Sequence, residues 1–177
     1  RDNYFAQISY DYTLENTNAD NQKFLRSLEK EHVLEIEEQR ILLCHGSPRK
    51  TNEFLWESTT PLHFLDIFFH QREVDYIAGT HTGIKWHANT SLGQFVNVGV
   101  LGRPENDSTT NVWFTTLDIS RDGIQHNFHP VVYDYDRLSR EMQMEGLPDE
   151  FIETIQTGRW TTCLEVLPQK ERQRLNH

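Results

Sequence analysis

Two stretches of the sequence decide the fold: ILLCHGSP at residues 41–48 and VDYIAGTHTG at residues 74–83. Each is a short apolar run that stops at a histidine, with a glycine within two residues after it. A continuous apolar run bounded by turn formers is typical of a strand buried on both faces. Because ligands in open α/β sheets bind beyond the carboxyl ends of such strands, we expect His45 and His81 to share a site.

Strand patterns fill much of the remaining chain. The predicted strands are 32–37, 40–44, 74–78, 85–88, 94–98, 111–119 and 124–133. A turn at Glu38-Gln39 joins the first two, and Arg121-Asp122-Gly123 joins the last two as a hairpin. A βαβ start followed by hairpins and helices predicts a mixed sheet, or two sheets packed together, with covering helices.

The first part of the chain is predicted less clearly than the part after Thr17. Residues 1–17 lack a clear period and are expected to be coil or partial helix. After them the spacing predicts a helix capped by Thr17, with its apolar face formed by Phe24, Leu25 and Leu28.

A further helix is predicted over 61–72, with Thr60 as its cap and Pro61 at its first position. Its apolar face would carry Leu62, Leu65, Ile67, Phe68 and Phe69. Two more helices are expected from 133 to about 145 and from about 149 to 157. Residues 158–177 are polar and basic and are expected to form a peripheral extension.

The composition excludes several classes of protein. A chain of 177 residues is long enough for one domain with a core, and none of its apolar runs approaches the ~18 residues of a membrane span. The net charge of −10 disfavours nucleic acid as a partner. No signal peptide is recognised at the start, and the two cysteines form neither a disulfide framework nor a zinc spacing. A reducing, cytoplasmic setting is therefore expected.

The histidines at the two strand ends are candidate metal ligands. Neutral imidazole suits Zn, Mn and Fe, and two histidines on neighbouring strand ends can hold one ion. A second ion would need carboxylates that neither histidine loop supplies, since Glu53 lies eight residues after His45. The role of His87 is left open. The remaining histidines are interpreted as ordinary surface or core residues: His32, His63, His70, His126, His129 and His177.

Glycines and one asparagine accompany the histidines. Gly46, Gly79 and Gly83 are either plain turn residues or positions where the backbone approaches an anion. Asn97 is either a polar strand end or a group that orients a ligand through its amide.

Cys44 offers a rival chemistry, nucleophilic catalysis by a Cys/His pair. That pair needs an exposed thiolate beside its base. Cys44 and His45 are neighbours on a strand, so their side chains point to opposite faces. Cys44 is therefore expected to be buried and unreactive.

Four blocks of the sequence together carry a family resemblance. They are LLCHGSPRKTNEFLWE at 42–57, AGTHTGIKW at 78–86, FVNVGVLGRPENDSTTNVWFTTLDI at 95–119 and YDYDRLSREMQMEGLPDEFIETIQTGR at 133–159. In this order they resemble the calcineurin-like metallophosphoesterases, and among these the small bacterial YfcE-like branch. The family's corresponding blocks are V-H-G-S-P…N-E-Y-L, G-H-T-H or G-H-T-G, and N-A-G-S-V-G-Q-P-R-D-G…Y, followed by its closing helices.

The resemblance implies a fold, an activity and a set of site residues. The fold would be a two-sheet α/β sandwich flanked by helices, with residues 1–160 as the C-terminal two-thirds of one metallophosphoesterase domain and 161–177 as an extension. Two divalent metal ions (Mn, Fe, Zn or Ni) would support hydrolysis of a phosphomonoester or phosphodiester by an activated water. The residues implied at this site are His45 and His81 on one ion, with Gly46, Ser47 and Asn97 at the substrate.

The substrate implied is a phosphorylated small molecule or a phosphoprotein, with neither nucleic acid nor a membrane as partner. The loops 47–57 and 99–110 are expected to line its pocket.

The sequence departs from the family pattern in two ways. The blocks D-x-H, G-D-x-x-x-x-G and G-N-H-D are absent and are expected to lie before Arg1. Gly83 stands where many relatives have the second histidine of G-H-T-H, so one metal would lose a ligand. These departures leave open an alternative function, a non-catalytic protein-binding scaffold on the same fold.

Overall fold

The two histidine-bearing runs form the centre of a five-stranded sheet in the computed structural model, which describes residues 3–173. The strands, in the sheet order β1-β2-β3-β5-β4, are β1 (Glu31–Ile36), β2 (Gln39–Cys44), β3 (Tyr76–Gly79), β5 (Gln94–Asn97) and β4 (Trp86–Asn89). The three central strands are parallel, and β1 and β4 are antiparallel to their neighbours. The carboxyl ends of β2, β3 and β5 therefore meet at one edge of the sheet.

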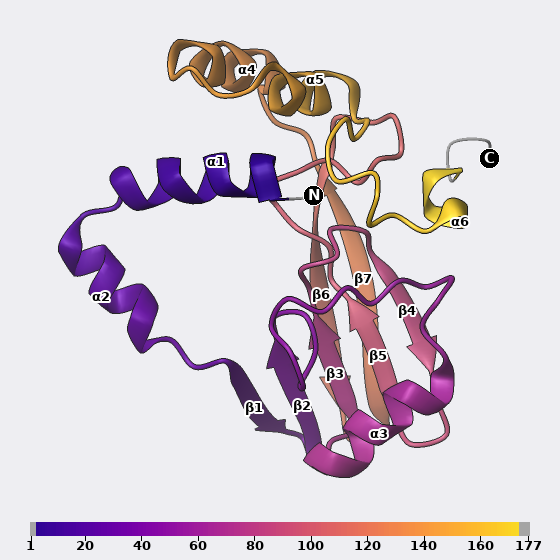
Figure 1. The fold of residues 1–177 in the computed structure, drawn as a ribbon. Helices are drawn as coiled ribbons and strands as arrows, with labels where there is room; N and C mark the ends of the chain where they lie inside the picture. Colours follow the sequence, from indigo (N-terminus) through magenta and orange to yellow (C-terminus); the bar gives the residue numbers. More distant parts are fainter. Residues whose placement is uncertain (1–2, 174–177) are drawn as a thin grey trace.

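A long hairpin forms the second sheet. It consists of β6 (Val112–Ser120) and β7 (Gly123–Val131), joined by the predicted turn, and it lies behind the larger sheet in Figure 1. Apolar side chains fill the space between the two sheets, among them Ile41, Tyr76, Val96 and Ile124. The expectation of two packed sheets is thus confirmed.

Helix α3 (Leu62–Arg72) covers the opposite face of the larger sheet (Figure 1). The buried residues of this layer are Leu42, Leu65, Phe68, Phe69, Ile77 and Phe95. Leu62 and Ile67 were expected on the same face but are 52% and 46% exposed. The predicted face was too wide, because only one stripe of a helix can contact a sheet.

Three predicted turns and caps are displaced or wrong. Pro61 has extended backbone angles and is itself the cap residue, without a side-chain hydrogen bond, so capping by Thr60 is wrong. The helix that begins at Ala19 is capped by Asn18 rather than by Thr17, since the Asn18 side chain accepts a hydrogen bond from the Asn21 N–H. The hairpin turn between β1 and β2 is Glu37-Glu38, one residue earlier than predicted.

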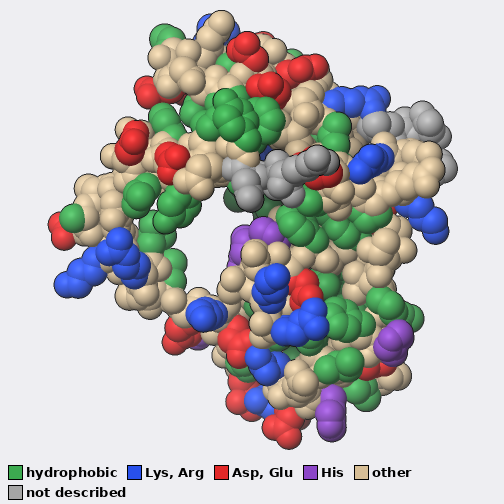
Figure 2. All heavy atoms as spheres, viewed as in Figure 1, with side chains coloured by type: hydrophobic (Ala, Val, Ile, Leu, Met, Phe, Trp, Pro, Cys, Tyr) green, Lys and Arg blue, Asp and Glu red, His purple; other side chains and the backbone are tan. Residues whose placement is uncertain are grey.

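Helices α1 (Asn3–Glu15) and α2 (Ala19–Ser27) form an arm that stands away from the sheet, and Figures 1 and 2 show an open passage between them and the sheet. A continuous α1 replaces the expected coil or partial helix. Its packing explains this, because the Phe5 and Phe151 rings lie 5.7 Å apart and the Tyr12 hydroxyl donates to Glu145 at 3.1 Å. Helix α2 buries none of its residues.

The C-terminal part contains α4 (Tyr135–Met144), α5 (Asp149–Thr157) and the short α6 (Gln169–Arg172). The first two were predicted, and Asp134 caps α4. The segment expected to be a peripheral extension is instead partly buried, since Trp160 and Leu167 pack with Trp56 and Ile84. Residues 174–177 of that segment, like residues 1–2, lie outside the described chain. Between residues 3 and 173, no helix combines the length and apolar character needed to cross a bilayer.

Candidate metal centre

His45 and His81 meet at the carboxyl edge of the parallel strands. Cys44 and Gly79 are opposite each other in the register of β2 and β3, so the residues that follow emerge side by side. The Nε2 atom of His45 lies 3.0 Å from Nδ1 of His81, and the two ring centroids are 4.9 Å apart. The structure therefore brings together the two histidines that the sequence predicted to share a site, and Figure 2 shows histidine side chains at the edge of the open passage.

The pair fits two ligands of one transition-metal ion. Two nitrogens bound at about 2.0–2.1 Å and at right angles lie about 3 Å apart. Burial, and next the charge of His45, lower the pKa of His81 and so favour the neutral imidazole that a metal needs. Within residues 3–173 no group of three or more His, Cys, Asp or Glu side chains could hold an ion, so these two histidines are a partial ligand set.

Unusual backbone angles position both histidines. His81 itself has a φ of 75°, a left-handed conformation that is rare outside glycine. Gly46 has a φ of 74°, and a Cβ there would lie 2.5 Å from the Lys50 carbonyl oxygen. Gly46 is thus a position that only glycine fits, and it allows the chain to turn sharply just after His45.

Polar side chains hold the loop that carries His81. The Thr80 hydroxyl donates to the Gly99 carbonyl at 2.7 Å, and the Thr82 hydroxyl donates to the Leu55 carbonyl at 3.1 Å. Asn97 is fully buried at the end of β5; its amide nitrogen donates to the Thr80 carbonyl at 3.4 Å and its oxygen accepts from the Gly99 N–H at 3.1 Å. The Asn97 side chain therefore ties two loops of the site together.

Ser47 is buried in the loop that follows β2. Its hydroxyl donates to Glu53 and accepts the backbone N–H groups of Arg49 and Lys50 at 3.2 and 3.1 Å. Glu53 also pairs with the Arg49 side chain. In this structure the polar atoms of Ser47 bind the chain itself, as do those of Asn97, so contact of Gly46, Ser47 and Asn97 with a substrate stays a prediction.

The thiol of Cys44 is poorly suited to nucleophilic chemistry. Burial, followed by the Glu31 carboxylate, raises the pKa of Cys44 to about 12. A neutral thiol is a weak nucleophile near pH 7. Cys44 is partly buried rather than fully buried as expected, and its neutral thiol disfavours the Cys/His chemistry.

A cavity of about 440 Å³ opens beside His81. Asn52 and Phe54 line it from the first predicted pocket loop, and Val100 and Arg103 line it from the second. The Phe54 and His81 ring centroids are 4.6 Å apart. Both loops therefore line this cavity, and its use as the substrate pocket stays a prediction.

Trp160 contributes another wall, and neither its role nor that of Arg103 was anticipated. Trp160 lies in the segment whose polar composition suggested an extension, and nothing in the sequence distinguished Arg103 from other loop arginines.

Gly83 lies directly against Trp160. A Cβ on Gly83 would be 3.2 Å from Cζ2 of the indole, and the φ of Gly83 is +79°. The indole therefore takes up the space into which a side chain at this position would extend. The packing of Trp160 against Gly83 is therefore consistent with a glycine, and not a histidine, at position 83.

Comparison with known proteins supports the fold. No family model matches the sequence, and no curated protein matches it. Among solved structures, hypothetical protein PH1004 from Pyrococcus horikoshii OT3 is similar, with a TM-score of 0.70, 21% identity, and coverage of 85% of this chain and 59% of that one. A metallophosphoesterase from Sphaerobacter thermophilus has a TM-score of 0.68 and 19% identity, over 88% of this chain and 70% of that one.

These similarities define the class of fold, which is the calcineurin-like metallophosphoesterase fold with two sheets and flanking helices. The chain spans 59% of the length of PH1004. Placement in the YfcE-like branch stays a prediction.

Proposed function

We propose that this chain belongs to a metal-dependent phosphoesterase that hydrolyses a phosphomonoester or phosphodiester. The observation that carries the proposal is the pairing of His45 with His81, 3.0 Å apart at the carboxyl ends of adjacent parallel strands. The similarity of the fold to a solved metallophosphoesterase supports it.

His45 and His81 would hold one of two divalent ions, with Mn, Fe, Zn and Ni all compatible with imidazole ligands. Bound there, such ions would polarise a phosphoryl oxygen and lower the pKa of a water molecule. The protein's own part is positional: Asn97 and Thr82 hold the His81 loop through hydrogen bonds, and Phe54 packs against the His81 ring. These contacts pre-organise the imidazoles.

The substrate would be a phosphorylated small molecule or a phosphoprotein side chain. The cavity beside His81, about 440 Å³, falls in the range typical of small-ligand pockets, about 300–1,000 Å³. Its aromatic walls would accept the organic part of a phosphate ester.

The test combines metal content with hydrolysis. The protein is incubated with Mn²⁺ and freed of excess ion; bound manganese and the hydrolysis of para-nitrophenyl phosphate and bis(para-nitrophenyl) phosphate are then measured. His45→Ala and His81→Ala are each expected to reduce Mn²⁺ affinity and turnover at least about 100-fold, since even residues that only orient ligands contribute about 10–100-fold.

His70→Ala is the matched control, because His70 is exposed on α3. It should leave both measurements unchanged. Absence of bound Mn²⁺ in the wild-type protein, or full metal-stimulated activity in either site variant, would refute the proposal.

A non-catalytic protein-binding scaffold is the second candidate, and the contact between Gly83 and Trp160 favours it. That contact crowds the space a further ligand at position 83 would need, and the φ of +79° disfavours a side chain there. A scaffold would bind a protein partner equally well with His45 and His81 replaced by alanine, which distinguishes it from the enzyme.

A further inference from the structure

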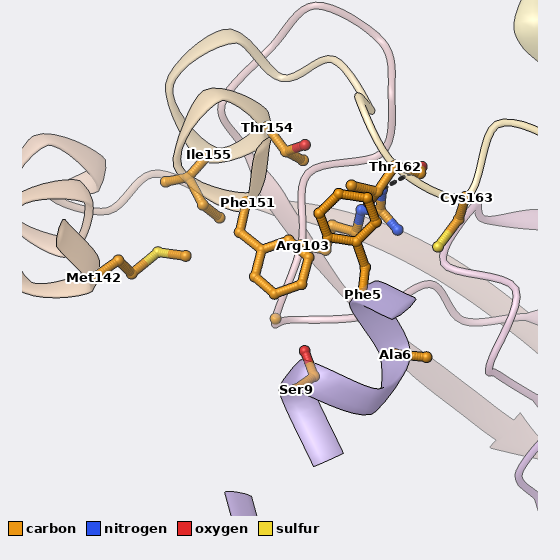
Figure 3. A pocket seen from close by; sticks show the side chains of 11 residues that line it. Phe5, Ala6, Ser9, Arg103, Met142, Phe151, Thr154, Ile155, Thr162 and Cys163 are labelled. Atoms are coloured by element: carbon orange, nitrogen blue, oxygen red, sulfur yellow. Dashed lines mark hydrogen bonds between the residues drawn. The ribbon is translucent and has the colours of Figure 1, made fainter. Parts of the chain in front are cut away.

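Arg103 is a cation placed between two cavities. It lines the cavity beside His81, of about 440 Å³, and also a second one of about 270 Å³ between α1 and α5. Figure 3 shows the second cavity, with Arg103 beside Phe5, Phe151 and Thr162. A group bound in either cavity would be within reach of the same guanidinium.

The Arg103 side chain is held in a fixed orientation. Its guanidinium carbon lies 3.8 Å from the centroid of the Trp160 ring, a cation–π contact. Its Nη2 donates to the carbonyl and the hydroxyl of Thr162 at 3.2 and 3.4 Å. The Trp160 indole in turn donates to the Pro104 carbonyl at 2.7 Å. Stacking and hydrogen bonding together pre-organise the planar fork.

The guanidinium has no carboxylate partner in the described part of the chain. The ion pairs there involve other basic residues. Burial, the largest effect, lowers the pKa of Arg103, and the neighbouring Cys163 thiol opposes this shift. Lys85, which like Arg103 is partly buried, differs because it is paired with Glu105. Burying a charge without a counter-charge is costly unless an anion completes the site.

We infer that Arg103 binds a second anionic group of the substrate, at the end of the cavity that begins at His81. The ligand would be an organic phosphate that carries a further phosphate or carboxylate, with its linking portion between Phe54 and Trp160. Arginine suits both groups, because its fork donates two parallel hydrogen bonds to an oxyanion. The inference rests on the proposed function for the place of the scissile phosphate.

Anion binding can be tested without any metal. In protein labelled with ¹⁵N at arginine, the Nε–H resonance of Arg103 is assigned by its loss in Arg103→Lys, and pyrophosphate is added to metal-free protein. We expect the resonance to shift in a saturable way. A resonance that does not move while other signals saturate would overturn the inference, and this result does not depend on catalysis.

Selectivity is tested with matched substrates in the manganese-loaded protein. Alkanediol bisphosphates of increasing chain length are compared with the corresponding alkyl monophosphates. Arg103→Gln should raise KM for the best bisphosphate about tenfold or more beyond any change in KM for the corresponding monophosphate, as expected for a hydrogen bond to a charged group. Arg103→Lys should retain part of the preference because it keeps the charge.

The outcomes separate the two proposals. An equal loss for both substrates in Arg103→Gln would show a structural role and overturn the inference. Hydrolysis of neither substrate by the wild-type protein would refute the phosphoesterase, and the metal-free titration would still decide whether Arg103 binds anions. Carboxylate binding is distinguished by repeating the titration with succinate.

Discussion

His81 combines a left-handed backbone with a side chain that meets a second imidazole. Such a conformation costs of order 1–3 kcal/mol in a residue other than glycine and persists only where neighbouring contacts fix it. Here Thr80 and Thr82, on either side, bind Gly99 and Leu55 through their hydroxyls. The backbone strain at His81 is thus the local cost of placing its imidazole beside that of His45.

Cys44 gives a prediction at this scale. Because its pKa is raised to about 12, its thiol should stay protonated and react with iodoacetamide at pH 8 far more slowly in the native than in the denatured protein. Mass spectrometry of alkylated peptides over time checks this. Equal rates in the two states would show that the thiol is ionised or freely accessible.

Gly83 gives a second prediction. Gly83→His should not add a metal ligand, because the new side chain meets the Trp160 ring and a φ of +79° disfavours it. The free energy of unfolding should fall by about 1–3 kcal/mol, the usual cost of overpacking. Urea unfolding measures this, with Gly102→His as the control, since a Cβ added at Gly102 would have no heavy atom within 4 Å. Higher Mn²⁺ affinity in Gly83→His would contradict the expectation.

At the scale of elements, three parallel strands end together and each is followed by part of the site. The loop after β2 carries His45, the loop after β3 carries His81, and β5 ends in Asn97. The strands fix where the loops begin, and the Asn97 amide fixes how two of the loops lie relative to each other.

Asn97→Ala should therefore loosen the His81 loop. The variant removes both hydrogen bonds of a buried amide, which costs about 1–3 kcal/mol of stability. Mn²⁺ affinity should fall along with it. Asn89→Ala, at an exposed position of β4, should change neither quantity. Thermal unfolding and metal titration provide the two measurements, and unchanged Mn²⁺ affinity in Asn97→Ala would argue against its positioning role.

The elements also show what a sequence can and cannot predict. Buried strands such as β2 and β3 follow from continuous apolar runs, and His45 and His81 from their position at the strand ends. Helix α1 was missed because its stability comes from contacts of Phe5 and Tyr12 with distant helices. Arg103 was missed for the same reason, since its partners Trp160 and Thr162 are almost sixty residues away.

At the scale of the whole molecule, α3, the larger sheet and the hairpin form successive layers. The interface between the larger sheet and the hairpin makes the stability of the protein depend on pH. His126 of the hairpin lies 4.7 Å from His87 of β4, measured between ring centroids. Burial, and next the charge of His87, lower the pKa of His126. The folded protein thus binds fewer protons than the unfolded chain below the ordinary histidine pKa of about 6.5.

The contribution of His126 to the free energy of unfolding should therefore be fully present above about pH 6.5. It should decline as the pH falls from there toward the lowered pKa of His126. Urea unfolding at a series of pH values measures the slope. His126→Gln should reduce this slope, and His70→Gln, on the exposed surface of α3, should leave it as in the wild-type protein. A slope unaffected by His126→Gln would place its origin elsewhere.

Among residues 3–173, β6 and β7 pair only with each other, so the outer margin of each nine-residue strand presents backbone groups without a strand partner. On β7 this margin is interrupted by Pro130, which has no N–H to offer. The β6 margin contains neither proline nor lysine, residues that commonly prevent edge strands of two molecules from pairing with each other. Self-association of this protein should therefore occur through the free edge of β6. Particle size in light scattering should grow with protein concentration, and a Thr116→Lys substitution should suppress that growth.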